Sequence, residues 1–112
     1  MLEALWSIGF ITGQGLHGAG VVIFETGRVF GGDSYFYWVG SYSVGDGTIT
    51  GEVDVRRHME GLPFIFPGLE GGRVRFTGPI NSPTMLLTRS LVNNPTQQIA
   101  VQFTRLAELP NP

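Results

Sequence analysis

The chain has 112 residues, a common size for one domain with a single hydrophobic core, so we expect residues 1–112 to form one domain. Hydrophobic residues make up 42% and the formal net charge is −2, which excludes a disordered chain and argues against a nucleic-acid binder held by phosphate contacts. The chain contains no cysteine, which excludes disulfides and thiolate metal sites. No stretch approaches the roughly 20 apolar residues of a membrane helix and no signal peptide is recognisable, so we expect a cytoplasmic protein that does not enter a membrane.

Alternation of apolar and polar residues, the period of a half-buried strand, recurs along most of the chain. In the first such stretch Trp6, Ile8 and Phe10 share a face, and further on Thr26-Gly27 forms a turn that sets Glu25 opposite Arg28. The glycine-rich stretch 13–18 and residues 93–95 are interpreted as a loop and a turn. The pattern predicts strands over residues 4–12, 19–25, 28–32, 36–42, 48–57, 73–77, 84–91 and 97–106.

Residues 36–57 carry the strongest hairpin signal, because Asp46-Gly47 separates an aromatic run from a strictly alternating one. A two-residue turn there places Tyr42 opposite Gly51 and Trp38 opposite Val55. One face of the hairpin is then apolar and the other charged. We predict that Trp38, Tyr42, Val53 and Val55 are buried and that Glu52, Asp54 and Arg56 are exposed.

Eight short strands joined mostly by tight turns, with no helical period, predict an all-β fold. Sequential hairpins favour a small eight-stranded antiparallel up-and-down barrel over a sandwich, since a closed barrel leaves no open edge. Such a barrel is filled by its own side chains or holds one small ligand. The stretch 62–68, in which two prolines bracket three large apolar residues, suits neither a helix nor a central strand. We expect it to cover a barrel mouth or to contact a second subunit.

The sequence contains one spacing typical of a nucleotide site, G-x-G-x-x-G from Gly13 to Gly18. A dinucleotide site also requires a helix that begins at the third glycine, and residues 19–24 are typical of a strand instead. We therefore interpret the motif as chance spacing in a glycine-rich chain, and we expect no cofactor.

Candidate catalytic groups are few. Glu52 and Asp54 share a strand face, where an acid/base pair is one interpretation and cross-strand ion pairs with Arg73 and Arg75 are the favoured one. His58 lies too far along its strand from Asp54 for an orienting hydrogen bond. No nucleophile with a base and no cluster of metal ligands emerges, so we predict that the protein is not an enzyme and binds no metal.

Asp33 follows two glycines and precedes the aromatic strand. A short carboxylate at such a bend accepts hydrogen bonds from backbone N–H groups. We predict a structural role in the turn for Asp33 rather than a role in ligand binding.

Five segments within about the first 60 residues share, in order, the pattern of a known family. They are Trp6–Ile11, Gly18–Ile23, Gly27–Asp33, Val39–Tyr42 and Gly51–Val55. In these segments the chain resembles the GrlR-like family of small bacterial regulators, named for a negative regulator of type III secretion. The resemblance implies a lipocalin-like barrel, a homodimer, and regulation through protein contact or a bound apolar molecule. The regulator that names the family carries an acidic run, used for partner contact, at the turn matching residues 43–47, whereas here only Asp46 is acidic.

Two functions are carried forward from these patterns. The first is a non-enzymatic regulatory or binding protein that acts through protein contact as a homodimer. The alternative is a carrier of a small apolar, lipid-like molecule inside the barrel. The candidate residues lining its cavity are Trp6, Trp38, Tyr42, Val53 and Phe76.

The predicted dimer face follows from a surplus of apolar residues in strands two and three. Val21, Ile23 and Phe30 share one face, while Val22, Phe24 and Val29 occupy the other. A barrel wall can turn only one of these faces into its core. We predict that Val21, Ile23 and Phe30 form a homodimer interface, with the Phe64–Phe66 segment as an additional contact.

Overall fold

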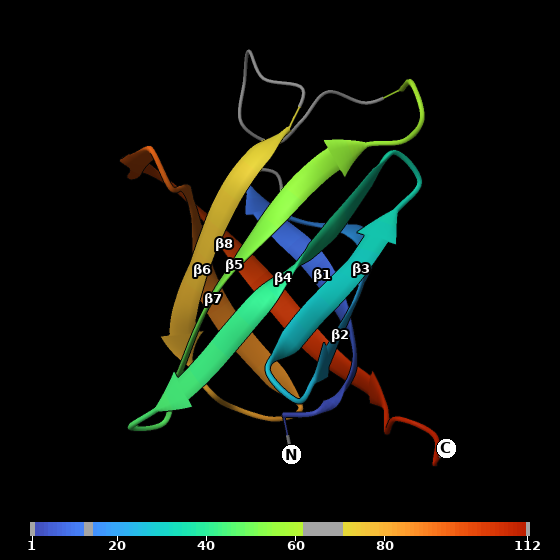
Figure 1. The fold of residues 1–112 in the computed structure, drawn as a ribbon, viewed down its shortest axis with the longest axis vertical. Helices are drawn as coiled ribbons and strands as arrows, with labels where there is room; N and C mark the ends of the chain where they lie inside the picture. Colours follow the sequence, from blue (N-terminus) through green and yellow to red (C-terminus); the bar gives the residue numbers. More distant parts are fainter. Residues whose placement is uncertain (1, 13–14, 62–70, 112) are drawn as a thin grey trace.

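The computed structural model describes residues 2–12, 15–61 and 71–111, with the side chains of residues 12–19 outside the description. These residues form eight antiparallel strands and no helix, and the strands close into a barrel in which β1 pairs with β8 (Figure 1). The two ends of the chain lie at the same end of the barrel (Figure 1). The strands are β1 (Ala4–Thr12), β2 (Gly15–Glu25), β3 (Arg28–Asp33), β4 (Phe36–Gly45), β5 (Thr48–Arg57), β6 (Gly72–Pro79), β7 (Thr84–Leu91) and β8 (Asn94–Ala107). The predicted all-β barrel is confirmed.

Two tight turns set the register of the first half of the barrel. Asp46 and Gly47 have φ of 54° and 72°, and Thr26 and Gly27 have φ of 49° and 81°. Positive φ at both central residues is typical of the type I′ turn, whose twist matches that of the two strands of a hairpin. Glycine adopts this backbone conformation at no steric cost. The predicted pairs follow: Gly45 with Thr48, Tyr42 with Gly51, Trp38 with Val55, and Glu25 with Arg28.

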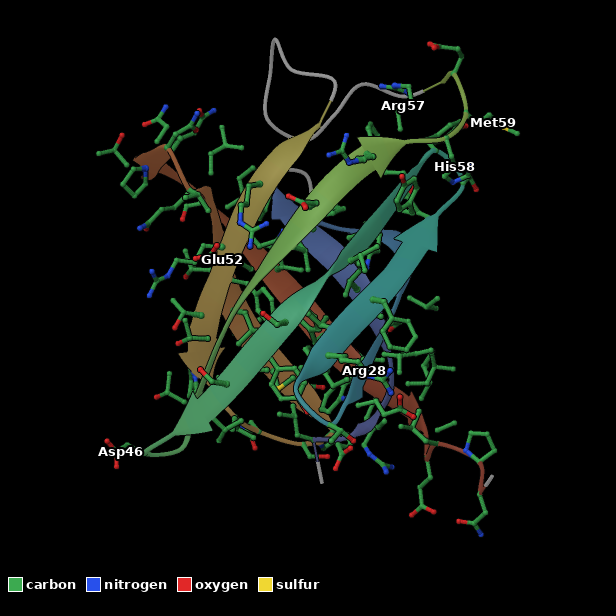
Figure 2. All side chains as sticks on the ribbon, viewed as in Figure 1. Arg28, Asp46, Glu52, Arg57, His58 and Met59 are labelled. Carbon is green, nitrogen blue, oxygen red and sulfur yellow. The ribbon has the colours of Figure 1, made fainter. Side chains whose placement is uncertain are left out.

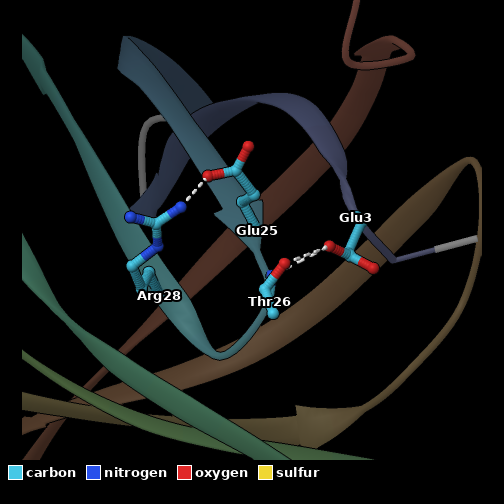
Figure 3. Close-up of polar contacts among 4 residues, drawn as sticks. All are labelled: Glu3, Glu25, Thr26 and Arg28. Atoms are coloured by element: carbon cyan, nitrogen blue, oxygen red, sulfur yellow. Dashed lines mark hydrogen bonds and ion pairs between the residues drawn. The ribbon is translucent and has the colours of Figure 1, made fainter. Parts of the chain in front are cut away.

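A side chain of the N-terminal segment also contacts the turn between β2 and β3 (Figure 3). The backbone N–H of Thr26 donates to Glu3 Oε1 at 2.8 Å, and the Thr26 hydroxyl donates to the same oxygen at 3.2 Å. Arg28 forms an ion pair with Glu25, which is the opposite-charge pair expected from the sequence. Both contacts lie at the surface, so they add little stability and mainly fix the geometry of the turn.

Alternation along each strand separates a buried interior from a polar exterior. On β5, for example, Ile49, Val53 and Val55 are buried, whereas Glu52 and Asp54 point outward. Phe76 packs across the bare backbone of its partner Gly51, where an added Cβ would lie 2.3 Å from the ring. The described hydrophobic residues with no more than 2% exposure are Ala4, Trp6, Phe24, Val29, Ile49, Val74, Met85, Leu87 and Val101.

Several sequence-based strand boundaries differ from the structure: β4 and β6, for example, extend to Gly45 and over Gly72–Pro79. Two of the differences turn an expected loop or turn into strand. Strand β2 begins at Gly15, because most of the expected 13–18 loop pairs with the end of β1. Strand β8 begins at Asn94, which pairs with Leu91, so residues 92–93 form the turn. The register shifts between Ser90, which pairs with Gln98, and Leu91, so residues 95–97 form a bulge in β8. A bulge is a position where a strand tolerates proline, and Pro95 lies in this one. The stretch 62–68 lies outside the described residues.

Candidate functional site

The barrel interior contains a cavity of about 30 Å³. The described residues that line it are apolar or aromatic, apart from Arg89. A volume of this size holds one or two water-sized groups. The interior is therefore filled mainly by the side chains of the barrel itself.

A cluster of aromatic rings packs inside the barrel. The ring of Phe24 lies 5.2 Å from Tyr42, 6.0 Å from Phe103, 6.1 Å from Phe76 and 6.5 Å from Trp6, measured between ring centroids. Edge and tilted contacts of this kind are favourable beyond the area they bury. An elongated ligand inside the barrel would have to displace several of these rings.

The predicted cavity-lining residues divide into two groups. Trp38, Val53 and Phe76 line the cavity. Trp6 is fully buried, and its indole N–H donates to the Leu2 carbonyl oxygen at 2.9 Å. Tyr42 is half-buried, which corrects the expectation of full burial, because it lies toward the turn end of the β4–β5 hairpin.

Arg89 is the buried charge that the sequence interpretation missed. It is 6% exposed and points inward from β7, on the same face as Met85, Leu87 and Leu91. Its guanidinium carbon lies 5.3 Å from the centre of the Phe10 ring. Burial lowers the pKa of Arg89 to about 10, and the charge of Asp33 opposes that change. The alternation of β7 carries the signal that could have placed Arg89 inside.

Asp33 makes the backbone contacts that the turn interpretation predicts. Its Oδ1 accepts hydrogen bonds from the N–H groups of Tyr35 at 2.8 Å and Phe36 at 2.7 Å. The Asp33 carbonyl oxygen lies 3.0 Å from His58 Nε2, and the His58 ring lies 6.4 Å from that of Tyr37. Figure 2 shows His58 beyond the end of β5, beside Arg57 and Met59. The contacts of His58 thus tie β5 to the β3–β4 bend.

The charged side chains of β5 and β6 pair on the outside of the barrel. Arg73 Nε donates to Glu52 Oε1 at 2.8 Å, and an Arg73 terminal nitrogen donates to Asp54 Oδ1 at 3.1 Å. The hydrogen bond to Glu52, followed by that to Asp54, raises the pKa of Arg73. Figure 2 shows Glu52 on this outer face. The favoured interpretation of the two carboxylates as cross-strand ion pairs is confirmed for Arg73.

An apolar band crosses the outer face of four neighbouring strands. The pairings Leu5–Ile23, Ile23–Phe30 and Phe30–Val39 join one row of outward side chains from β1 to β4. Beside this row, Val21 and Tyr37 are both 41% exposed, and Val39 within it is 53% exposed. We call the six residues Leu5, Val21, Ile23, Phe30, Tyr37 and Val39 the outer apolar band. It contains the predicted dimer-face residues, and it adds Leu5, Tyr37 and Val39, which the sequence interpretation did not include.

The fold assigns the chain to the class of small closed antiparallel β-barrels. Comparison of the sequence with models of known protein families and with curated proteins finds no match. Among the residues that the structure describes, no three His, Asp or Glu side chains gather as a metal site would require. Over the same residues, no helix has the length and apolar character of a membrane span.

Proposed function

We propose that the protein is a non-enzymatic regulatory or binding module that acts as a homodimer through its outer apolar band. The observation that carries the proposal is the continuity of that band across four paired strands. Contiguous apolar patches of a few hundred Å² on soluble proteins typically mark interaction sites. A self-complementary patch closes under two-fold symmetry, the commonest arrangement of protein oligomers.

The closed barrel also limits how a partner can bind. Each described strand has a paired neighbour on both sides, including β1 with β8, so the barrel offers no strand that is free along its whole length. Only the ends of some strands, such as residues 43–45 of β4 and 94–100 of β8, are unpaired on one side. We therefore expect contact mainly through outward side chains. The outer apolar band supplies aliphatic and aromatic groups, and Asp54 and Arg56 lie at its β5 border, where they pair with Val39 and Tyr37. An apolar centre with a charged rim is typical of a protein interface.

The size of the cavity favours this proposal over a carrier of an apolar molecule. About 30 Å³ is much smaller than the several hundred Å³ typical of small-molecule pockets. The titratable groups singled out in the sequence also have structural partners, with Asp33 on backbone N–H groups and Glu52 and Asp54 on Arg73. These contacts support a binding role in preference to catalysis.

The resemblance to GrlR-like regulators supplies the biological part of the proposal. On that basis the partner is a bacterial regulatory protein, the location is the cytoplasm, and the effect is negative regulation of type III secretion. This part rests on the sequence segments quoted above.

Oligomeric state tests the proposal directly. Ile23→Glu places a charge within the outer apolar band and is expected to give a folded monomer, while the wild-type chain sediments as a dimer at tens of micromolar. Leu86→Glu is the matched control, because Leu86 is 56% exposed on the outer face of β7, away from the band. It should leave the dimer intact. A monomeric wild-type protein, or an Ile23→Glu variant that still dimerises, would refute the proposed interface.

A further inference from the structure

A polar groove lies where β5 ends and β6 begins. Its volume is about 630 Å³, which is within the range of small-molecule pockets. Three arginines, Arg56, Arg57 and Arg73, are among the described residues that line it, together with one acidic residue, Asp54. The whole chain has seven Lys or Arg residues and a formal net charge of −2. The groove therefore concentrates positive charge on a protein that is negative as a whole.

Arg56 is the cation of this groove that is open to a ligand. It is exposed on β5, and its side chain has no hydrogen bond or ion pair with the described residues. On one side it pairs with Tyr37 of β4, which is 41% exposed and also lines the groove. On the other side Gly71 lies against the backbone of β5, where an added Cβ would be 2.4 Å from the Val55 carbonyl oxygen. Arg56 thus lies between an aromatic side chain and bare backbone.

Arg73 lines the same groove from β6 and keeps a donor for a ligand. Its Nε and one terminal nitrogen donate to Glu52 and Asp54, and 50% of its side chain is exposed. Its second terminal nitrogen has no acceptor among the residues that the structure describes. Arg73 pairs directly with Asp54, so Arg73 and Arg56 are diagonal neighbours across β5 and β6. Long side chains at such positions are within reach of each other, so one ligand can contact both guanidinium groups.

The neighbouring carboxylates do not cancel the positive charge of Arg56. Glu52 and Asp54 both bind Arg73, and Glu52 also pairs in register with Arg75 of β6. Two carboxylates therefore face two arginines on this part of the wall, and the charge of Arg56 is additional. A guanidinium binds the oxygens of a carboxylate or a phosphate through paired N–H groups. The groove is thus suited to a negatively charged ligand that presents such oxygens.

We propose that this groove binds a small molecule that carries two or more carboxylate or phosphate groups, held by Arg56 and Arg73. A single such group would fill a minor part of about 630 Å³, and the two arginines come from different strands. A ligand with at least two anionic groups uses both arginines at once. The exposed ring of Tyr37 offers an apolar contact for the rest of the molecule.

Isothermal titration calorimetry at low ionic strength tests the site, with pyrophosphate and citrate as separate probes. We expect saturable binding to the wild-type protein, and the tighter probe identifies phosphate or carboxylate as the preferred group. The affinity should fall by about tenfold or more in Arg56→Gln, which removes charged hydrogen bonds to the ligand. Arg75→Gln is the matched control, because Arg75 is exposed on β6 and is not among the described lining residues. It should keep the wild-type affinity.

Both substitutions remove one positive charge, so a nonspecific attraction of anions would weaken equally in the two variants. Equal losses in Arg56→Gln and Arg75→Gln, or no saturable binding of either probe to the wild-type protein, would overturn the proposal.

Backbone amide chemical shifts of the wild-type protein locate the bound probe without any substitution. Changes that saturate at residues 55–57 and 71–73 support the groove. The turn at Asp46 lies at the opposite end of the barrel from Arg57, and its shifts should stay constant (Figure 2). Changes confined to other parts of the chain would place the anion elsewhere and contradict the proposal. None of these outcomes depends on the oligomeric state.

Discussion

Replacement of Arg89 by methionine is expected to stabilise the protein, although it removes a large side chain from the interior. Burial lowers the pKa of Arg89 from its ordinary value to about 10. A shift of that size corresponds to about 3 kcal/mol of unfavourable burial of the charged form at neutral pH. The contact with Phe10 offsets about 1 kcal/mol of this cost. Arg89→Met retains a long flexible side chain, so we expect the free energy of unfolding to rise by about 1–2 kcal/mol.

Urea unfolding measures this change, with Trp6 and Trp38 as buried fluorescent probes. The folded-state pKa of Arg89 lies below its unfolded value, so the unfolded chain holds more protons from about pH 10 up to the ordinary pKa of an arginine side chain. In the wild-type protein, the contribution of Arg89 to the free energy of unfolding therefore increases with pH over that range. The Arg89→Met variant lacks this contribution. Destabilisation by more than about 2 kcal/mol at neutral pH would refute the reasoning, because it would mean that the cation has strong partners in the folded state.

Two further substitutions test the interior and the β3–β4 bend. Val53→Asp puts a carboxylate into the cavity lining and should cost several kcal/mol in urea unfolding, and a loss below about 1 kcal/mol would mean that Val53 is not held in the core. Asp33→Ala removes the acceptor of two backbone N–H groups and should cost about 2 kcal/mol, while Asp33→Asn keeps an acceptor oxygen and should lose less. Equal stability of the Ala and Asn variants would show that the turn does not depend on these hydrogen bonds.

The parts of the fold that could be predicted from sequence are those controlled by local turn chemistry. Asp46-Gly47 and Thr26-Gly27 fix two registers because a two-residue turn allows one pairing of its flanking strands. Residues 15–18 were expected in a loop and lie in β2 for a related reason. A glycine-rich stretch has weak local preference, and the strand state of these residues depends on pairing with the end of β1, a contact formed at the level of the sheet.

The candidate site was only partly predictable, because its properties depend on the whole barrel. The alternation along β7 predicts that the Arg89 side chain points into the barrel. The sequence of β7 alone does not predict the cavity that this side chain lines. The outer apolar band likewise depends on contacts between several strands. Val21, Ile23 and Phe30 were found from the two apolar faces of β2 and β3. Val39 joins them only through the β3–β4 register, which the Ser34-Tyr35 connection sets without a strong turn signal in its sequence.

The filled interior and the apolar exterior are two consequences of one constraint. An eight-stranded barrel has room for about one layer of large side chains on its inner face, and here Phe24, Phe76 and Phe103 occupy it. Further apolar residues in the same strands must then point outward, where Phe30 and Val39 are found. Exposed aliphatic and aromatic side chains favour association, and solubility selects against them when they have no partner. The outer apolar band is therefore better explained by an interface than by the requirements of the barrel, whose core is complete without it.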